Sequence, residues 1–136
     1  MSHTVDIPQE LKDSIRKFRF TRHKGNAALV VKINKQKLIM EEVDKFDNIS
    51  LEELAEELPV ASPRYVVLSY NLIHKDGRTS SPLVLINWAP ACEISLLTLH
   101  ASALRDFQIA VDIVKDLEVR DGAEGLTKSI LEAKLS

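Results

Sequence analysis

The sequence predicts an α/β domain in which a central mixed, mostly antiparallel sheet is sandwiched between helices on both faces. Amphipathic and apolar segments follow one another in the order helix, hairpin, helix, hairpin, long helix, short strand, helix. The segments 27–33, 64–73 and 82–89 are apolar on both sides of the pleat, which indicates that helices cover both faces. The 136 residues contain no repeat, low-complexity tract or long linker, so we expect one domain spanning residues 1–136.

The first helix is predicted over residues 6–20. Its apolar stripe consists of Leu11, Ile15 and Phe18. Asp6 is expected to be the N-cap, and Pro8 suits the first turn. Residues 27–33 and 37–43 are separated by a short polar turn and predict a hairpin.

A short second helix should begin after Ser50. Ser50 and Glu53 are spaced as a capping box, and Ile49 and Leu54 as a hydrophobic staple. Pro59 should end this helix.

The second hairpin is the strongest strand signal in the chain. Residues 64–73 and 82–89 should pair, with residues 74–78 as the turn. Asp76 and Gly77 form the kind of dipeptide that makes a tight hairpin turn.

The longest helix is predicted over residues 93–115. Its apolar stripe consists of Leu96, His100, Ala103, Phe107, Ala110 and Val114. Leu97, Ala101 and Leu104 widen this stripe beyond what one packed face requires. A short strand over 117–119 and a closing helix over 127–135, capped by Thr127, complete the domain.

The charges are unevenly placed, although the formal net charge is only −2. Residues 1–24 hold six cations against three acids, whereas residues 41–57 hold eight acids against one lysine. We interpret the acidic segment as a solvated face. A nucleic-acid partner is not expected, because the charge balance over the whole domain is not basic.

No membrane association is expected either, since no apolar run approaches the length of a membrane span. Cys92 is the only cysteine and the start of the chain lacks an export-signal pattern, so a cytoplasmic location is expected.

A search for catalytic chemistry finds no motif. Cys92 and the histidines lack the spacing of metal ligands, and the glycines form no phosphate-binding loop. We therefore expect no catalytic residue, no metal and no cofactor, and an enzyme is disfavoured. His100 is interpreted as a half-buried packing residue. A general acid/base role for it would need a partner that the sequence does not identify.

Several stretches resemble the glia maturation factors, which belong to the actin-depolymerising-factor (ADF) homology, or cofilin-like, family. The most specific is the pattern HxDGRxSxP over residues 74–82, preceded by the run PRYVV at 63–67. Residues 15–20 (IRKFRF) and 118–120 (EVR) are also similar, and 88–90 (WAP) is shared with cofilin-like relatives more broadly. The resemblance runs from about residue 11 to 135.

This resemblance implies the ADF-homology fold and a function without cofactors. Glia maturation factors bind the branch-nucleating actin-related-protein (Arp) complex, inhibit nucleation and promote debranching, with weak or no direct actin binding. By the same resemblance we expect a monomer in the cytoplasm, at the actin cytoskeleton in cortical patches. The alternative within the fold is a cofilin-like protein that binds and severs actin filaments.

The resemblance also implies two partner-binding surfaces. The first comprises Arg16, Arg19, Arg22, Leu97, Ala101, Leu104 and Arg105. The second comprises His74, Lys75, Asp76, Gly77, Arg78, Glu132 and Lys134. Basic residues beside surplus apolar surface independently suit an interface. Leu97 fits an interface and a helix-packing role equally well, whereas Leu104 fits the interface better.

The sequence departs from the resemblance at two positions of the long helix. Relatives usually carry lysine where Leu104 stands, and glia maturation factors carry a second one where Asp106 stands. The missing lysine at 104 argues against the cofilin-like alternative. Ser2 resembles the phosphorylation site of cofilin relatives, and a phosphate there could mask Arg16 and Arg19.

Overall fold

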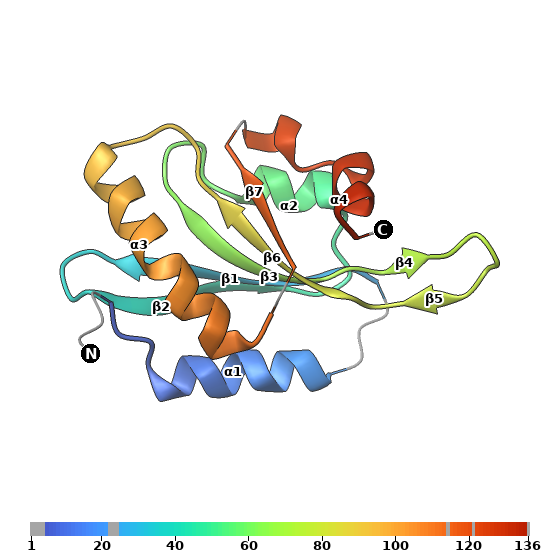
Figure 1. Cartoon of the computed structure of the whole chain (residues 1–136), viewed down its shortest axis with the longest axis horizontal. Helices are drawn as coiled ribbons and strands as arrows, with labels where there is room; N and C mark the ends of the chain where they lie inside the picture. Colours follow the sequence, from blue (N-terminus) through green and yellow to red (C-terminus); the bar gives the residue numbers. More distant parts are fainter. Residues whose placement is uncertain (1–4, 22–24, 114, 121, 136) are drawn as a thin grey trace.

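A computed structural model describes residues 5–21, 25–113, 115–120 and 122–135 (Figure 1). Its elements are α1 Gln9–Phe20, β1 Ala27–Asn34, β2 Ile39–Phe46, α2 Leu51–Glu57, β3 Arg64–Ser69, β4 Leu72–Ile73, β5 Thr79–Ser80, β6 Leu83–Trp88, α3 Ile94–Val111, β7 Asp116–Val119, a 3-10 turn Gly122–Gly125 and α4 Lys128–Leu135. This is the predicted order, except that the second hairpin is divided into two pairs of strands.

The main sheet has five strands in the order β2-β1-β3-β6-β7. All neighbours are antiparallel except β6 and β7, which are parallel. The prediction of a mixed, mostly antiparallel sheet is therefore confirmed. The long strands predicted over 64–73 and 82–89 are wrong in one respect, because β4 and β5 form a separate two-stranded sheet that projects from the body (Figure 1).

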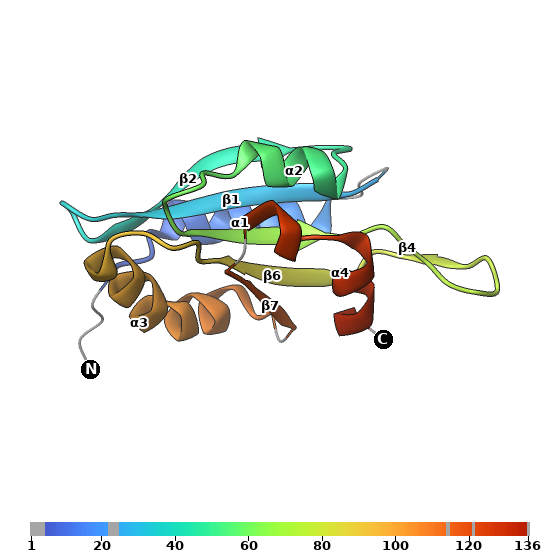
Figure 2. The same ribbon diagram turned by 90° about the horizontal axis from the view of Figure 1, so that it is seen from above.

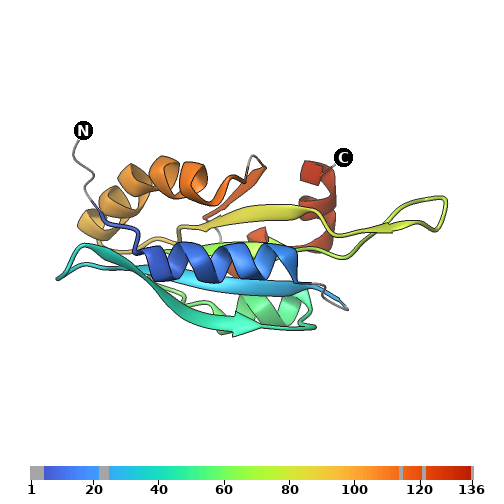
Figure 3. The same ribbon diagram turned by 90° about the horizontal axis from the view of Figure 1, so that it is seen from below.

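Helices cover both faces of the main sheet, as the sequence predicted. On one face, α2 and α4 pack on strand residues that include Val66, Leu68 and Ile86 (Figure 2). On the other, α1 and α3 pack on the alternate residues, including Val67 and Leu85 (Figure 3). The period of two along each strand places successive side chains in opposite layers, so the stretches 65–68 of β3 and 83–86 of β6 are apolar on both faces.

The start of α1 differs from the prediction. Asp6 is not the N-cap, since Pro8 occupies that position and the helix begins at Gln9. The backbone N–H of Asp6 instead donates to the carbonyl of Leu38 (2.9 Å), and its carbonyl accepts from the N–H of Met40 (2.9 Å). Asp6 is therefore committed to an extended bridge beside β2, which excludes the geometry of a cap.

The end of α3 also differs. The predicted helix over 93–115 stops at Val111, because Asp112 adopts the left-handed conformation (φ 55°) that ends helices. Val111 is buried in place of the predicted Ala110, which is exposed, and Val114 lies outside the described residues. Positions 110 and 111 both continue the spacing of 100, 103 and 107, so the helical period alone did not distinguish them.

The other local predictions agree with the structure. The Ser50–Glu53 capping box is complete, with Glu53 N donating to Ser50 Oγ at 3.1 Å. Ile49 packs against the core cluster that contains Leu54. Thr127 accepts a hydrogen bond from Ile130 N (3.3 Å) at the start of α4.

Candidate functional site

One flank of α3 carries four of the predicted interface residues, which we call the α3 flank: Leu97, Ala101, Leu104 and Arg105. Successive rotation of about 100° per residue places all four on one side of the helix, and Leu97 and Ala101 share a hollow there with Glu118 of β7. Ala101 and Arg105 are exposed and the two leucines are half-buried. Leu104 packs against the core beneath α1 and α3, so part of its surface serves the fold.

A hollow of about 340 Å³ lies beside the α3 flank. Leu97 and Ala101 form one wall, and Ala89 and Ala91 contribute further small side chains. At the rim, Arg120 pairs with Glu118 at 3.0 Å. The flank therefore combines apolar surface with peripheral charge, as protein interfaces do.

The base of this hollow is a buried polar pair. His100 is 2% exposed rather than half-buried as predicted, and its Nε2 lies 2.5 Å from Asn87 Oδ1. Its ring stacks on Tyr65, whose hydroxyl donates to the carbonyl of His100. Burial, together with the positive charge of Arg64, lowers the pKa of His100 to about 4. The imidazole is thus neutral at pH 7 and serves to seat α3 on the sheet.

Two of the arginines predicted for the same surface, Arg16 and Arg19, lie elsewhere. Arg16 and Arg19 line a hollow of about 370 Å³ between α1 and the C-terminal end of α3. Arg19 Nη1 donates to the carbonyl of Val111 (2.8 Å) and lies 3.9 Å from Asp112 Oδ2. Arg19 thus satisfies a carbonyl at the end of α3, where a cation is favourable.

The predicted first surface is therefore divided between two sides of α3. Leu97 and Ala101 line the hollow beside β7, whereas Arg16 and Arg19 line the hollow beside the C-terminal end of α3. Figure 1 shows α1 and β7 on different sides of α3. Arg22 and Ser2 are outside the described residues, so their predicted roles stay predictions.

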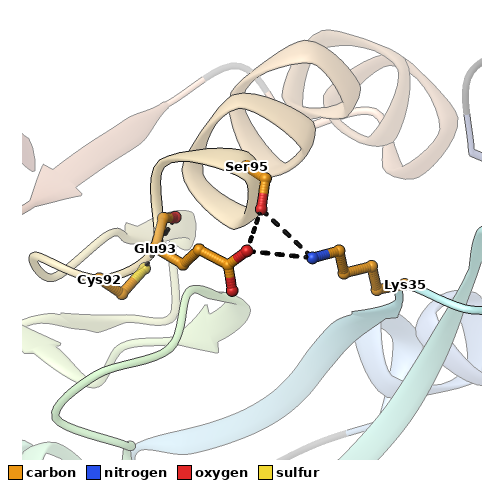
Figure 4. Close-up of polar contacts among 4 residues, drawn as sticks. All are labelled: Lys35, Cys92, Glu93 and Ser95. Carbon is orange, nitrogen blue, oxygen red and sulfur yellow. Dashed lines mark hydrogen bonds and ion pairs between the residues drawn. The ribbon is translucent and has the colours of Figure 1, made fainter.

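A group of hydrogen bonds that the sequence did not indicate connects the first turn of α3 to the β1–β2 turn (Figure 4). Lys35, between β1 and β2, lies 3.3 Å from Glu93 Oε1 and 3.2 Å from Ser95 Oγ. Ser95 Oγ also donates to Glu93 at 2.6 Å, and these contacts with Ser95 and Lys35 lower the pKa of the Glu93 carboxyl. The thiol of Cys92 lies 3.8 Å from the carbonyl of Glu93. Lys35 and Glu93 are 58 positions apart, and neither belongs to a recognisable motif, so no local signal could have paired them.

The predicted second surface begins with the hairpin tip, residues His74, Lys75, Asp76, Gly77 and Arg78. The turn has three residues rather than two, because Gly77 N donates to the carbonyl of His74 (3.0 Å) and His74 N to that of Arg78 (2.8 Å). Gly77 has φ 89°, a conformation that glycine adopts without a steric penalty. Such a loop is the three-residue class of hairpin turn.

The side chains of the hairpin tip bond to one another. Asp76 Oδ1 accepts from Arg78 N (3.1 Å) and Oδ2 from Arg78 Nε (2.6 Å), and both bonds lower the pKa of Asp76. His74 Nε2 lies 2.9 Å from Ser80 Oγ across the ladder. Lys75 is exposed. The tip is thus shaped by local hydrogen bonds and presents its cations to solvent.

The last helix joins this surface at the root of the hairpin. Glu132 of α4 accepts a 2.5 Å hydrogen bond from the hydroxyl of Tyr70, which lies two residues before β4. The two line a hollow of about 430 Å³, which we call the hairpin-root hollow. Lys134 is exposed on the same helix. Glu132 therefore lies at the root of the hairpin, whereas residues 74–78 of the tip do not line this hollow, and their grouping with Glu132 into one surface stays a prediction.

Two other kinds of site are absent from the described residues. No group of histidine, cysteine, aspartate and glutamate side chains there could hold a metal ion. Among the same residues, no helix is both long and apolar enough to cross a membrane.

Comparisons with known proteins identify the class. Residues 4–136 match the family of cofilin/tropomyosin-type actin-binding proteins. The glia maturation factor of Drosophila melanogaster is 37% identical over 96% of this chain and 94% of its own length. Human glia maturation factor beta is 35% identical over 96% of this chain and 92% of its own. The solution structure of a Caenorhabditis elegans glia maturation factor superimposes with a TM-score of 0.82 at 31% identity, covering 98% of both chains.

The chain therefore belongs to the cofilin-like, ADF-homology family of actin regulators and, within it, to the glia maturation factors. Both the predicted resemblance and the predicted fold are confirmed.

Proposed function

We propose that the chain binds the branch-nucleating Arp complex, inhibits actin nucleation and promotes debranching of filaments. The observation that carries the proposal is the similarity to glia maturation factors along 96% of the chain. That similarity supports an actin-related role without a cofactor.

The α3 flank is the proposed contact with the Arp complex. Ala101 and Arg105 are exposed there beside the half-buried Leu97. Arginine is enriched among the interface residues that dominate binding energy, so Arg105 is the residue of the flank expected to contribute most. Arg105 supplies a cation one residue beyond Leu104, where relatives carry lysine.

The hairpin tip is the proposed contact with a neighbouring filament subunit, which is present only at a branch. Its turn is fixed by Gly77 and by the Asp76–Arg78 pair, so Arg78 is directed without a large ordering cost. Competition at this contact would release the branch.

A second candidate is direct binding and severing of actin filaments, which the family description as actin-binding proteins favours. Against it stands Leu104, which replaces the lysine of cofilin relatives and packs partly against the core.

One experiment separates the two candidates. We expect the purified protein to bind labelled Arp complex, shorten branch lifetimes and leave bare filaments uncut. Arg105→Glu should weaken Arp-complex binding about tenfold, because reversing an interface charge opposes docking. Lys45→Glu is the matched control, since it makes the same charge change at an exposed site on β2. Severing of bare filaments without Arp-complex binding would establish the cofilin-like function instead.

In cells we expect a cytoplasmic monomer at cortical actin patches. Light scattering during gel filtration checks the monomer, and a fluorescent fusion imaged beside an actin marker checks the location.

A further inference from the structure

The first turn of α3 contributes little to the core. The buried residues of this helix are His100, Ala103, Phe107 and Val111. None of the residues 94–99 is buried, and Ile94 is 79% exposed. Among these six, Leu99 packs partly against the core beneath α1 and α3. Core packing therefore fixes α3 mainly from His100 onward and leaves the first turn to other contacts.

The first turn also lacks two features that commonly stabilise the start of a helix. Glu93 occupies the N-cap position, but its side chain makes no capping hydrogen bond, and the first turn contains no acidic residue. The N–H groups of Leu96 and Leu97 donate to the carbonyl of Glu93 at 3.1 and 3.2 Å and begin the helical ladder. Because helices fray from their ends, these two bonds report on the order of the first turn.

Lys35 connects this turn to the main sheet. It lies in the β1–β2 turn, in which Asn34 Oδ1 accepts hydrogen bonds from two backbone N–H groups, both at 3.1 Å. Its ammonium group reaches Glu93 and Ser95, which also bond to each other, so the three side chains form a closed network (Figure 4). An exposed ion pair alone contributes little, whereas a network whose members orient one another contributes more. The network thus joins the start of α3 to an ordered turn of the sheet.

The position of the first turn matters because of the residues that follow it. Leu97 comes two residues after Ser95, and Ala101 about one helical turn later, and both line the hollow beside β7. Ala89 and Ala91 also line this hollow, and their short side chains leave room beside Leu97. A shift of the first turn would therefore move Leu97 without opposition from close packing.

We propose that Lys35 is a positioning residue of the α3 flank. Its network with Glu93 and Ser95 orders the first turn of α3 and so holds Leu97 in the orientation that a partner contacts, while Lys35 itself does not contact the partner. The inference rests on the proposed function for the identity of that partner, the Arp complex.

Amide exchange in the free protein tests the ordering directly. Lys35→Met keeps a long side chain and removes the ammonium group, so the amides of Leu96 and Leu97 should exchange about threefold faster. Lys37→Met is the matched control, because Lys37 is exposed in the same turn and loses the same charge. It should leave both exchange rates unchanged, and Lys35→Arg, which still donates to both acceptors, should restore them. Equal rates in wild type and Lys35→Met, or equal acceleration of all core amides, would overturn the proposal.

Binding to labelled Arp complex tests the consequence for the flank. Lys35→Met should weaken binding about threefold, whereas Lys35→Arg and Lys37→Met should leave it unchanged. In a protein that already carries Glu93→Ala and Ser95→Ala, the network is absent, so Lys35→Met should have no further effect. An undiminished effect in that background would mean that Lys35 contacts the partner itself, which overturns the positioning role.

The two measurements separate this inference from the proposed function. Wild-type protein that does not bind the Arp complex overturns the proposed function, and the exchange rates of the free protein then decide whether Lys35 orders the first turn. Wild-type binding with equal affinities for Lys35→Met and Lys37→Met overturns the positioning role alone.

Discussion

The strand pairs β3–β6 and β4–β5 continue a single antiparallel register, yet they have opposite surroundings. Val67 faces Leu85 in the main sheet, and both are 0% exposed. Ile73 faces Thr79 beyond the sheet, where Ile73 is 66% exposed. The same backbone ladder therefore passes from a region covered by helices on both faces to one in which Leu72 still packs against the core but Ile73 and Thr79 are exposed.

This difference suggests that the main sheet supplies the stability of the domain, whereas the hairpin is available for contact with a partner. In the main sheet, apolar burial holds the strands together. Beyond Leu72 the hairpin lacks that cover, and an isolated two-stranded ladder is marginal in water. It is shaped instead by its turn, by Asp76 with Arg78 and by His74 with Ser80. These exposed groups contribute little to the core, which leaves them available for a partner.

The largest expected effect is on the free energy of unfolding, when an apolar side chain in each of the two regions is shortened to alanine. Leu85→Ala removes a fully buried side chain and should lower the free energy of unfolding by about 2–5 kcal/mol. Ile73→Ala, at an exposed position, should change it by within about 0.5 kcal/mol. Urea unfolding followed by circular dichroism measures both. Similar losses of unfolding free energy in the two variants would contradict this difference between the main sheet and the hairpin.

The next effect is the pH dependence of stability due to His100. Its pKa is lowered from 6.5 to about 4 in the folded protein, so the unfolded chain binds the proton more tightly. The contribution of neutral His100 to the free energy of unfolding is therefore fully present above pH 6.5 and is lost as the pH falls toward 4. The total loss is of the order of 3 kcal/mol, since one pKa unit corresponds to about 1.4 kcal/mol.

His100→Gln provides the control for that titration. Glutamine does not ionise, so the variant should be less stable at pH 7 and lose less stability than wild type between pH 6.5 and 4.5. Urea midpoints at a series of pH values give the difference. Parallel curves for the two proteins would show that His100 does not contribute to the acid sensitivity.

Local sequence patterns predicted most of the fold because its elements are locally encoded. The capping box at Ser50, the cap at Thr127 and the continuous apolar strands all specify structure through near neighbours. The predictions failed where a distant contact decided the outcome. Asp6 pairs with β2 instead of capping α1, and no local signal distinguishes these two uses of an aspartate.

The site was predicted less completely for the same reason. The hairpin tip follows one continuous motif, and its residues do lie together. The first surface was assembled from two helices, and the sequence could not show that Arg16 and Arg19 lie across α3 from Leu97. Arg19 was predicted as a surface cation, but its bond to the Val111 carbonyl depends on where α3 ends. For that reason Arg16→Glu tests the basic surface with less effect on stability than Arg19→Glu.

A smaller effect is expected at the hairpin tip, on function rather than stability. Asp76→Ala with Arg78→Ala, keeping Gly77, should slow debranching about tenfold and leave binding to the free Arp complex within about twofold, because the tip is proposed to act only at a branch. Branch lifetimes observed by microscopy give the debranching rate, and fluorescence anisotropy gives the affinity for the free Arp complex. Parallel losses in both assays would mean that the tip has no separate role.

The smallest expected effect tests whether the hairpin unfolds independently of the sheet. Gly77 has φ 89°, and alanine in that region costs about 1 kcal/mol, although the space around Gly77 is open. If the uncovered hairpin opens locally, Gly77→Ala should speed amide exchange in β4 and β5 and leave the urea midpoint nearly unchanged. Ser102→Ala, at an exposed site on α3, is the control for the substitution itself. If Gly77→Ala instead lowers the urea midpoint by the full cost of the strained turn, the hairpin belongs to the cooperative unit of the main sheet. The continuous register would then couple the two regions, and the separation of stability from recognition would not hold.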